Sequence, residues 1–440
     1  MINKFLRLIF SKPLLTLKLA RPRRIRNAII FLCKNKGNMA QLYKRYQGIY
    51  GTSDNTLIHD ELVEAAKSLQ SKKDLFILPI IDWGFRHQRP QQLALSLGKL
   101  GYRVFYFSTT PLMGAGMQKY QFVKQPFENV FVCKLNAATT QIDDIHQNEM
   151  TNVIRDSYQI ALNVLMTELE IDSPVLVLNH PYWFPLAKLS PHFLLGYDCM
   201  DHHAAFHEAE FEGILDNEKE LIINADFVVT SSSYLSNKVS QVRENQIVRN
   251  GCEYEFFSNV AQWRSSKKTI AGYVGAIAEW FDIDLLIAVA EKLPHWEFQL
   301  VGSTAGCDIR EAMKLPNIIF IGEVEYGNLL GYMDQFDVCM IPFKLTELTK
   351  ATNPVKVYEY LAAGRAVVSS PLPEVLLLKE KVFIASDAAS FANQLQFALA
   401  SMKDSQLLSN WKRWASEQDW LIRAKQFDKI ILERNDRIAD

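Results

Sequence analysis

The chain has 440 residues, of which 48% are hydrophobic. It is too long for a single core and fits two α/β domains of about 200 residues each. With 48 basic and 49 acidic side chains, the net charge of −1 gives no indication of a partner, and we expect no nucleic-acid partner. The six cysteines are widely scattered, which is typical of reduced thiols in a cytosol and excludes a disulfide framework.

The charge is unevenly distributed along the chain. Residues 1–53 contain twelve Lys or Arg and no acidic side chain, whereas the remainder carries a net charge of −13. In this basic arm the cations alternate with apolar clusters at 5–10, 14–19 and 29–32, a pattern typical of amphipathic helices on anionic lipid. The alternative is a helical extension that packs on the body of the protein or on a partner protein.

The arm carries neither a membrane span nor a signal peptide pattern. No apolar run reaches the roughly 18 residues that a spanning helix needs. Basic residues interrupt the apolar stretches, and no small-residue cleavage site follows them. We therefore expect a cytoplasmic protein that is peripheral on the inner face of the cell membrane.

From residue 75 onward, strands and helices alternate. A buried strand at 75–81 precedes a helix at 89–97, in which Pro90 suits the first turn. Further strands are expected at 103–107, 130–134, 175–178, 194–197 and 227–230, with a long helix from about 143 to 170. Such alternation predicts a parallel sheet covered on both faces.

A second alternating series begins near residue 269, after a polar stretch at 258–268. Strands are expected at 270–274, 296–301, 318–321, 338–341, 366–369 and 382–384, and a final helix at 417–434. The predicted organisation is a basic extension at 1–73, a Rossmann-like domain at 74–257, a second Rossmann-like domain at 258–416, and a closing helix at 417–440. We expect the ligands between the facing carboxyl ends of the strands.

Several common catalytic motifs are absent from the sequence. It contains no Gly-x-Gly-x-x-Gly opening either domain, no Walker sequence, no His-Glu-x-x-His and no Gly-x-Ser-x-Gly. These absences disfavour dehydrogenases, kinases, zinc hydrolases and serine hydrolases.

One segment, residues 353–368, indicates phosphate binding. Asn353 and Pro354 stand where a helix begins, so its free backbone amides and dipole suit a phosphate, and Lys356 adds a point charge. Glu359 lies one turn further on, and a carboxylate there suits the two hydroxyls of a ribose. The alternative is an ordinary capped helix whose Lys and Glu are solvated.

The sequence resembles the GT-B glycosyltransferases, especially those of the bacterial cell-surface polysaccharide type that make teichuronic acid and capsule. The resemblance covers roughly residues 74–435. It rests on landmarks in both halves of the chain, at residues 82–83, 88–91, 197–201, 247–251, 272–277, 298–302, 317–322, 336–338 and 354–368.

The resemblance implies two Rossmann-like domains that face each other across a cleft, with the donor nucleotide on the C-terminal one. Glu359 would hold the ribose, and Gly322 with Val324 would face the base. The diphosphate would lie between the Gly275 loop and the helix start formed by Thr352, Asn353, Pro354 and Lys356. The closing helix would cross back onto the N-terminal domain. No cofactor or metal is implied, because the nucleotide sugar is a substrate.

Two departures from the large retaining family of this fold leave the stereochemistry open. Ala351 stands where that family has a second glutamate, and the residues after Gly275 lack its Arg and Lys. Inversion would need a general base, for which the candidates are Asp201, Asp198 and His180. Adjacent His202 and His203 diverge and suggest no third ligand, so no metal site is expected.

Arg86 and Arg89 precede the first helix of the N-terminal domain. They either contact a phosphate or the acceptor, or begin a solvated helix. The function expected overall is transfer of a sugar from a UDP- or GDP-linked donor to a saccharide or lipid-linked acceptor in surface polysaccharide biosynthesis. The alternatives are a nucleotide-sugar epimerase and a non-catalytic GT-B scaffold for another transferase.

Overall fold

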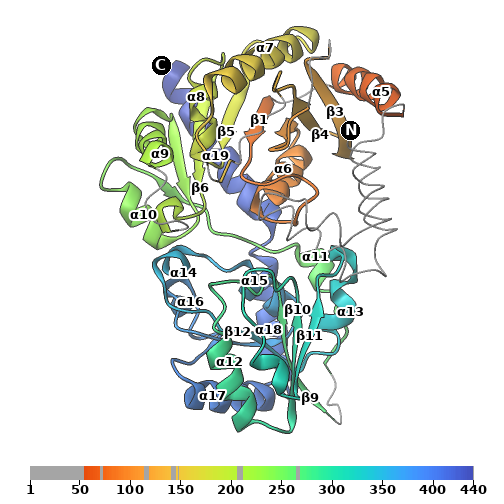
Figure 1. The fold of residues 1–440 in the computed structure, drawn as a ribbon, viewed down its shortest axis with the longest axis vertical. Helices are drawn as coiled ribbons and strands as arrows, with labels where there is room; N and C mark the ends of the chain where they lie inside the picture. The colour runs from red at the N-terminus through yellow and green to blue at the C-terminus, as the bar shows by residue number, and fades with distance from the viewer. Residues whose placement is uncertain are drawn as a thin grey trace, which may run out of the picture. The chain divides into compact units, whose positions relative to one another are not determined.

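The computed structural model describes residues 54–69, 73–112, 118–139, 145–146, 148–205, 212–263 and 268–439 (Figure 1). The chain divides into two units, residues 1–61 and 62–440, which are described separately. Of the first unit, the described residues begin helix α5 (Asp54–Ser68). The predicted basic arm at 1–53 lies outside the described residues.

The first sheet lies in the N-terminal half of the second unit. Its strand order is β3-β4-β2-β1-β5-β6-β7-β8, and every neighbouring pair is parallel except β3 and β4. The strands are β1 (Asp74–Leu78), β2 (Arg103–Phe107), β3 (Tyr120–Phe127), β4 (Val130–Leu135), β5 (Val175–Leu178), β6 (Leu194–Cys199), β7 (Phe227–Thr230) and β8 (Gln246–Ile247).

Helices cover both faces of this sheet. They are α6 (Arg89–Lys99), α7 (Asn152–Glu168), α8 (Phe184–Ala187), α9 (Glu212–Asn224) and α10 (Ser233–Val239), with short 3-10 turns η2 (Pro181–Trp183) and η3 (His203–Ala205). The long helix expected from 143 begins at Asn152, because the Thr151 side chain accepts the N–H of Ile154 at 3.4 Å and caps it there.

The second sheet has the order β11-β10-β9-β12-β13-β14, and all its strands are parallel. The strands are β9 (Thr269–Val274), β10 (Trp296–Val301), β11 (Ile318–Gly322), β12 (Val338–Ile341), β13 (Ala366–Ser369) and β14 (Phe383–Ile384). The helices are α12 (Ile283–Lys292), η4 (Ala312–Lys314), η5 (Tyr326–Asn328), α13 (Leu329–Met333), α14 (Glu347–Ala351), α15 (Val355–Ala362), α16 (Pro373–Leu376), α17 (Ala388–Ser401) and α18 (Ser405–Ser416).

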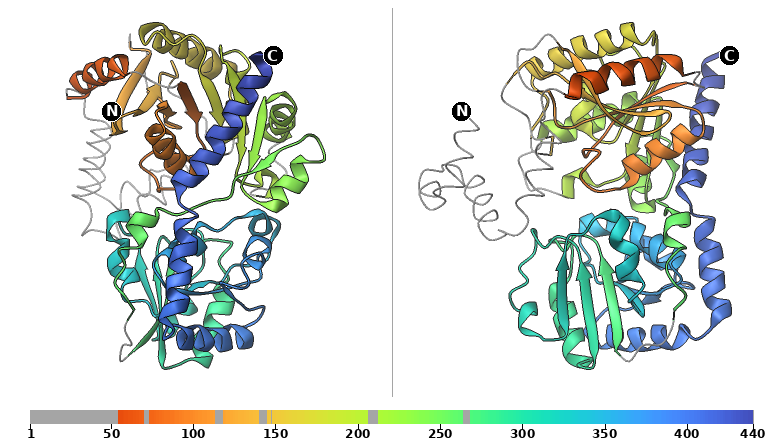
Figure 2. Two further views of the ribbon diagram at one scale, coloured as in Figure 1. Left: turned by 180° about the vertical axis from the view of Figure 1, so that it is seen from behind. Right: turned by 90° about the vertical axis from the view of Figure 1, so that its right-hand side faces the viewer.

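The polypeptide passes between the two sheets twice, side by side. The first passage, near α11 (Tyr254–Phe257), pairs with the second at Cys252, whose N–H donates to the carbonyl of Gln418 at 3.1 Å. The carbonyl of Cys252 accepts the N–H of Trp420, also at 3.1 Å. After α18, the last helix α19 (Trp420–Ala439) packs on α6 and on the first sheet, and Figure 2 shows it following α18 along one side.

Hydrophobic burial explains why these segments fold as they do. All five side chains of β2 are buried, as expected for a strand of a parallel sheet with both faces covered. On α19, Trp420, Ala424, Phe427 and Ile431 recur at helical spacing and enter the same core as Leu93 of α6. Within the described ranges, no helix is long and apolar enough to cross a bilayer.

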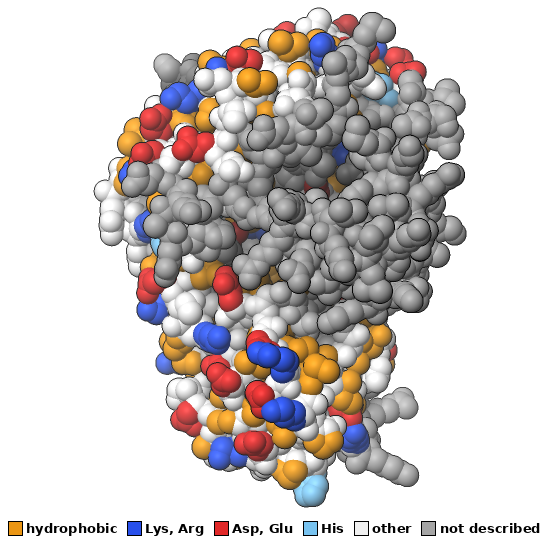
Figure 3. Space-filling view, in the orientation of Figure 1, with side chains coloured by type: hydrophobic (Ala, Val, Ile, Leu, Met, Phe, Trp, Pro, Cys, Tyr) orange, Lys and Arg blue, Asp and Glu red, His pale blue; other side chains and the backbone are white. Residues whose placement is uncertain are grey.

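The face drawn in Figure 3 carries a mixed surface. Over the C-terminal sheet domain, Lys and Arg lie among Asp and Glu, with apolar side chains between them. In the same domain, exposed neighbours form ion pairs, such as Lys314 with Glu311 at 2.6 Å and Lys350 with Glu347 at 2.8 Å. Pairs of this kind are typical of a solvated surface and contribute little to stability.

Candidate active site

The second sheet has a topological switch point between β9 and β12. The chain adds β10 and β11 on one side of β9, and β12 to β14 on the other. Ligands of open parallel sheets bind outside the carboxyl ends of the strands at such a point, because the loops there diverge. The loop after β9 and the start of α15 both lie at this edge.

Gly275 ends β9 in a conformation that other residues rarely adopt. Its φ is +142°, and its N–H donates to the carbonyl of Val301 at 2.8 Å. A Cβ added to Gly302 would lie 1.8 Å from the Gly275 carbonyl oxygen. The two loops therefore touch through their backbones, and only glycines allow that approach.

Lys356, in the first turn of α15, covers the Gly275 loop. A Cβ built on Gly275 would lie 2.4 Å from Cε and 2.7 Å from Nζ of Lys356. The ammonium lies 5.5 Å from the centre of the Tyr273 ring and 5.8 Å from that of Phe343. Among the described residues it has no carboxylate partner, and burial lowers its pKa. An unpaired cation beside the free amides of a helix start is suited to an anion.

Glu359 lies one turn beyond Lys356 and is half-buried. No described residue donates a hydrogen bond to its carboxylate. Burial raises the pKa of Glu359 to about 7, with Lys356 opposing the shift and Glu253 adding to it. Burial raises the pKa of Tyr326, and the charge of Glu359 adds to this shift. The carboxylate retains acceptor capacity for a ligand.

Arg86 brings a second cation to this site from the first sheet domain. Its Nε donates to Glu323 at 3.4 Å, and its side chain is 31% exposed. Its charge helps to lower the pKa of Lys356 and opposes the increase in the pKa of Tyr273 that burial causes. Arg86 and Lys356 thus act on the same region, above the Gly275 loop.

The loop after β11 presents Gly322 and Val324 near this edge. Gly322 has φ +87°, its carbonyl accepts the Gly302 N–H at 2.8 Å, and the space where a Cβ would stand is open. Val324 is half-buried and packs on the core of the second sheet. These placements leave the predicted contact with a base as a prediction.

Three residues at the expected phosphate site have structural contacts. Asn353 is 4% exposed; its Oδ1 accepts the N–H of Asn250 at 2.9 Å, and its Nδ2 donates to Glu374 at 2.9 Å. The hydroxyl of Thr352, the C-cap of α14, donates to the carbonyl of Leu348 at 2.9 Å. Pro354 is the N-cap of α15 and has no N–H. Their contact with a phosphate stays a prediction, and Lys356 and the first-turn amides are the groups best suited to it.

Arg89 and Asp198 form a buried ion pair. They are 3% and 0% exposed, and Arg89 Nη2 lies 2.7 Å from Asp198 Oδ1. Arg89 Nε also donates to both oxygens of Asp198, and its Nη1 donates to the carbonyl of Val248 at 2.9 Å. The guanidinium and the carboxylate satisfy each other, and the predicted ligand contact of Arg89 and the predicted role of Asp198 as a base stay predictions.

Asp201 and His180 lie at the carboxyl edge of the first sheet, after β6 and β5. Asp201 is half-buried and has no hydrogen-bond partner for its carboxylate among the described residues. Burial raises its pKa to about 6, with His146 opposing and Asp198 adding to the shift. His180 is 4% exposed, its Nδ1 accepts the N–H of Tyr182 at 3.2 Å, and burial lowers its pKa well below 6.5.

The role of Glu374 was not apparent from the sequence. It is 2% exposed, accepts the N–H of Ser233 at 2.8 Å and pairs with Arg249 at 2.8 Å. Together with Asn353 and Asn250 it joins α15 to the first sheet domain. The only signal was the place of Asn250 among the family landmarks, because no local pattern predicts contacts between such distant residues.

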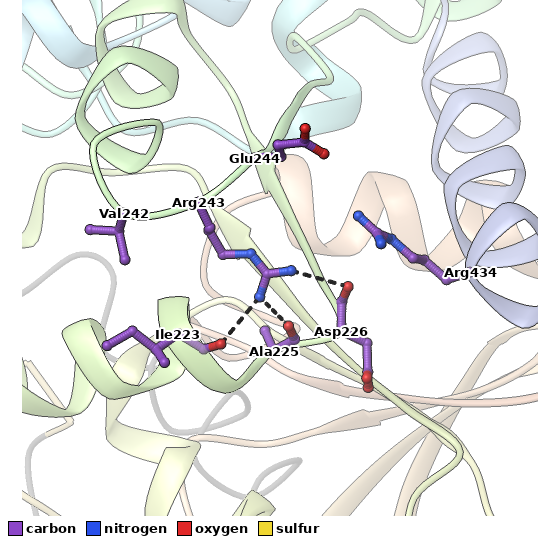
Figure 4. Close-up of a pocket in the computed structure, with 7 residues that line it drawn as sticks. All are labelled: Ile223, Ala225, Asp226, Val242, Arg243, Glu244 and Arg434. Atoms are coloured by element: carbon purple, nitrogen blue, oxygen red, sulfur yellow. Dashed lines mark hydrogen bonds between the residues drawn. The ribbon is translucent and has the colours of Figure 1, made fainter. Parts of the chain in front are cut away.

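A separate hollow near the start of β7 contains none of the predicted site residues (Figure 4). Its centre is Arg243, which donates to the carbonyls of Ile223, Ala225 and Asp226 at the end of α9. Carbonyls at a helix C-terminus lack intrahelical partners, so we assign Arg243 to capping. Across the described parts of the chain, no group of three or more His, Cys, Asp or Glu side chains could hold a metal.

Two parallel sheets, each with its own switch point, are the GT-B fold of glycosyltransferases. OtsA in its apo form has this fold at 13% identity, with a TM-score of 0.61 over 81% of this chain and 98% of its own. A glycosyltransferase of Rickettsia africae ESF-5 matches at 11% identity, with a TM-score of 0.58 over 83% and 99%. The E. coli trehalose-6-phosphate structure bound with UDP-2-fluoro glucose matches at 12% identity, with a TM-score of 0.60 over 81% of this chain and 98% of its own. Identities this low establish the fold alone.

Residues 268–401 match the family described as Glycosyl transferases group 1, so the chain carries a domain of that family. TuaH of Bacillus subtilis (strain 168), which is named as a teichuronic acid biosynthesis glycosyltransferase, is 31% identical over 201 residues. That match covers 40% of this chain and 50% of TuaH. The chain thus spans about half the length of this curated relative.

Proposed function

We propose that this protein transfers a sugar from a UDP- or GDP-linked donor to a saccharide or lipid-linked acceptor in surface polysaccharide biosynthesis. The observation that carries the proposal is the pairing of two unsatisfied groups one helical turn apart at the switch point. Among the described residues, no carboxylate forms an ion pair with Lys356 over the Gly275 backbone, and no group donates a hydrogen bond to the Glu359 carboxylate one turn beyond it. A nucleoside diphosphate supplies phosphates for the first and ribose hydroxyls for the second.

The residues divide the work of the reaction between them. Lys356, Arg86 and the first-turn amides of α15 hold the diphosphate, and Glu359 accepts the ribose hydroxyls. During transfer, the bond between the anomeric carbon and the β-phosphate oxygen breaks, and the negative charge grows on the leaving diphosphate. Fixed cations and amides at that position stabilise the charge as it develops.

On the acceptor side, we propose Asp201 as the group that orients the attacking hydroxyl and receives its proton. The new bond joins the acceptor oxygen to the anomeric carbon as the proton leaves. A base works best with a pKa near the operating pH, and burial brings the pKa of Asp201 to about 6. His180 lies at the same edge as a contact for the transferred or accepting sugar.

The partial match to TuaH supports the surface-polysaccharide role, and the UDP-linked ligand of the E. coli neighbour supports a nucleotide-sugar donor. The test is a thermal-shift panel of UDP-, GDP-, dTDP-, ADP- and CMP-sugars against the purified full chain. We expect stabilisation by at least one UDP- or GDP-sugar. The donor that stabilises the protein is then incubated with and without an acceptor extract.

The outcomes of these incubations distinguish a transferase from an epimerase and from a non-catalytic scaffold. Release of nucleoside diphosphate that depends on acceptor supports transfer. Conversion of the donor without acceptor would instead indicate an epimerase, and binding without turnover a scaffold. No stabilisation by any UDP- or GDP-sugar would contradict the proposal.

A further inference from the structure

A cluster of buried polar groups at the carboxyl ends of β5 and β6 contains atoms without partners. Asn179 is 2% exposed and His203 is 9% exposed, and within the part of the chain that the structure describes neither Asn179 Oδ1 nor His203 Nε2 has a hydrogen-bond partner. Buried polar atoms are nearly always paired, because an unpaired one loses the hydrogen bonds that it made with water. This cluster contains two such unpaired atoms, and the donor site uses neither of them. Their presence indicates a binding site for a ligand.

The histidines of this cluster lie against each other. The rings of His180 and His203 are 4.6 Å apart and nearly perpendicular, at 83°. Because His180 Nδ1 accepts the N–H of Tyr182, its Nε2 carries the proton and is a donor. The cluster therefore offers an amide oxygen that accepts, an imidazole N–H that donates, and a second imidazole whose Nε2 can serve in either role.

The cluster has no free positive charge. The nearby Arg89 is neutralised by Asp198, to which Asn179 Nδ2 also donates at 3.2 Å. Lys238, whose charge reaches His203, lies 3.9 Å from Glu218. Burial lowers the pKa of both His180 and His203, so the two rings are neutral near pH 7. Two further groups act on the cluster: the half-buried carboxylate of Asp201, and His146, whose ring lies 5.8 Å from that of His180.

We propose that Asn179, His180 and His203 bind the hydroxyl groups of an uncharged sugar ring, which is the acceptor of the reaction. This inference rests on the proposed function. A hydroxyl both donates and accepts, so neighbouring hydroxyls of one ring can satisfy Asn179 Oδ1 and His203 Nε2 together. A uronic acid or a sugar phosphate would bring a negative charge to a place where the described residues supply no unpaired cation and where Asp201 repels it.

The test uses p-nitrophenyl glycosides as probes, in the presence of the nucleoside diphosphate that stabilises the protein. The neutral set comprises glucoside, galactoside, mannoside and N-acetylglucosaminide, and the charged set comprises glucuronide and glucoside 6-phosphate. Binding is followed by saturation-transfer NMR and titrated to a Kd. We expect binding from the neutral set, at least ten-fold tighter than its charged counterparts.

Variants assign the binding to this cluster. His203→Ala and Asn179→Ala should each weaken the neutral glycoside at least ten-fold, whereas His203→Gln, which keeps a donor and an acceptor, should restore part of it. His295→Ala changes an exposed histidine before β10 and should have no effect. All variants should keep the thermal shift with nucleotide, which also shows that they fold.

Tighter binding of the glucuronide or the phosphate would overturn the inference. So would wild-type binding of glycosides by His203→Ala, or the absence of any glycoside binding by a wild-type protein that does bind nucleotide. If the wild-type protein bound no nucleotide, that result would instead contradict the proposed function.

Discussion

Asn250 and Asn353 are joined by two hydrogen bonds. The N–H of Asn250 donates to Oδ1 of Asn353 at 2.9 Å, and its side-chain amide donates to the carbonyl of Asn353 at 2.6 Å. Asn353 directly precedes the N-cap of α15, and Asn250 leads into the linker between the sheets. The position of the donor helix is therefore fixed against the linker, and Glu374 extends the link to Arg249 of the first sheet domain.

We predict that Asn353→Ala lowers the free energy of unfolding by about 1–3 kcal/mol, because it leaves the Asn250 N–H and one bond of Glu374 unsatisfied. Urea unfolding followed by fluorescence measures this change. Asn328→Ala is the control, since Asn328 is exposed and makes no side-chain hydrogen bond in α13. A change below 0.5 kcal/mol for Asn353→Ala, equal to the control, would contradict the role of the link.

Glu374 should make the contribution of this link to folding stability depend on pH, and the direction of that dependence follows from its pKa. Although burial opposes its ionisation, hydrogen bonds from Arg249 and Ser233 hold the pKa of Glu374 below its usual value. Its contribution to stability is thus present above the unfolded pKa of about 4.5 and is lost as the pH falls through the folded pKa. We expect Glu374→Gln to be less stable than wild type at pH 7, with the difference shrinking towards pH 3. A difference that is constant or grows on acidification would refute this assignment.

Removing either side chain of the buried Arg89–Asp198 pair should strongly destabilise the protein. Arg89→Ala leaves the Asp198 carboxylate buried without its partner, which we expect to cost about 3–5 kcal/mol. Denaturant unfolding of Lys188→Ala provides the comparison, because its pair with Glu220 is more than half exposed and should contribute under about 1 kcal/mol. If Arg89→Ala lost no more stability than Lys188→Ala, Arg89 would be available for the predicted ligand contact.

A side chain at position 275 should destabilise the protein and weaken nucleotide binding. Gly275→Ala combines a φ of +142° with a Cβ placed 2.4 Å from Lys356 Cε, so the lysine must move off the loop. We expect a loss of about 1–3 kcal/mol in stability and a clear drop in nucleotide affinity, measured by unfolding and by calorimetry. Gly327→Ala, with nothing within 4 Å of its added Cβ, should leave both nearly unchanged. Unaltered nucleotide affinity in Gly275→Ala would remove this loop from the site.

Alternation of hydrophobic segments was sufficient to predict both sheets, because a strand buried on two faces has a continuous apolar sequence. The strand expected at 296–301 coincides with β10. The antiparallel strand β3 was not predicted, since Lys124 and Pro126 interrupt its apolar pattern and five of its eight residues are not buried. Such a strand forms through its pairing with β4, which a local pattern does not contain.

The site was predictable where it depends on spacing within one helix, and not where it depends on distant partners. The three-residue spacing of Lys356 and Glu359 places them one turn apart in any helix. The partner of Arg89, by contrast, lies 109 residues away in β6, and the partner of Asn353 lies 103 residues away in the linker. The sequence therefore did not predict that Arg89 and Asn353 hold distant parts of the chain together.

Binding of the donor nucleotide sugar should release a proton from Glu359. Burial raises its pKa to about 7, so the folded protein binds this proton more tightly than the unfolded chain does. Its contribution to stability is present below about pH 4.5 and is lost as the pH rises through 7. Ribose hydroxyls donate to the ionised form, so nucleotide-sugar binding near pH 7 should release a proton. Calorimetry in buffers of different ionisation enthalpy should show this release in the wild-type protein and not in Glu359→Gln; equal release in both would contradict the coupling.

The most direct test of the donor site is the affinity of Glu359→Ala for the nucleotide sugar that stabilises the wild-type protein, measured by isothermal titration calorimetry. Loss of charged hydrogen bonds to the ribose should cost about 1.5–3 kcal/mol, which is roughly a 10- to 150-fold increase in Kd. Glu291→Ala, on the exposed face of α12, should bind as the wild-type protein does. An unchanged Kd for Glu359→Ala would show that the ribose does not bind this helix and would contradict the account.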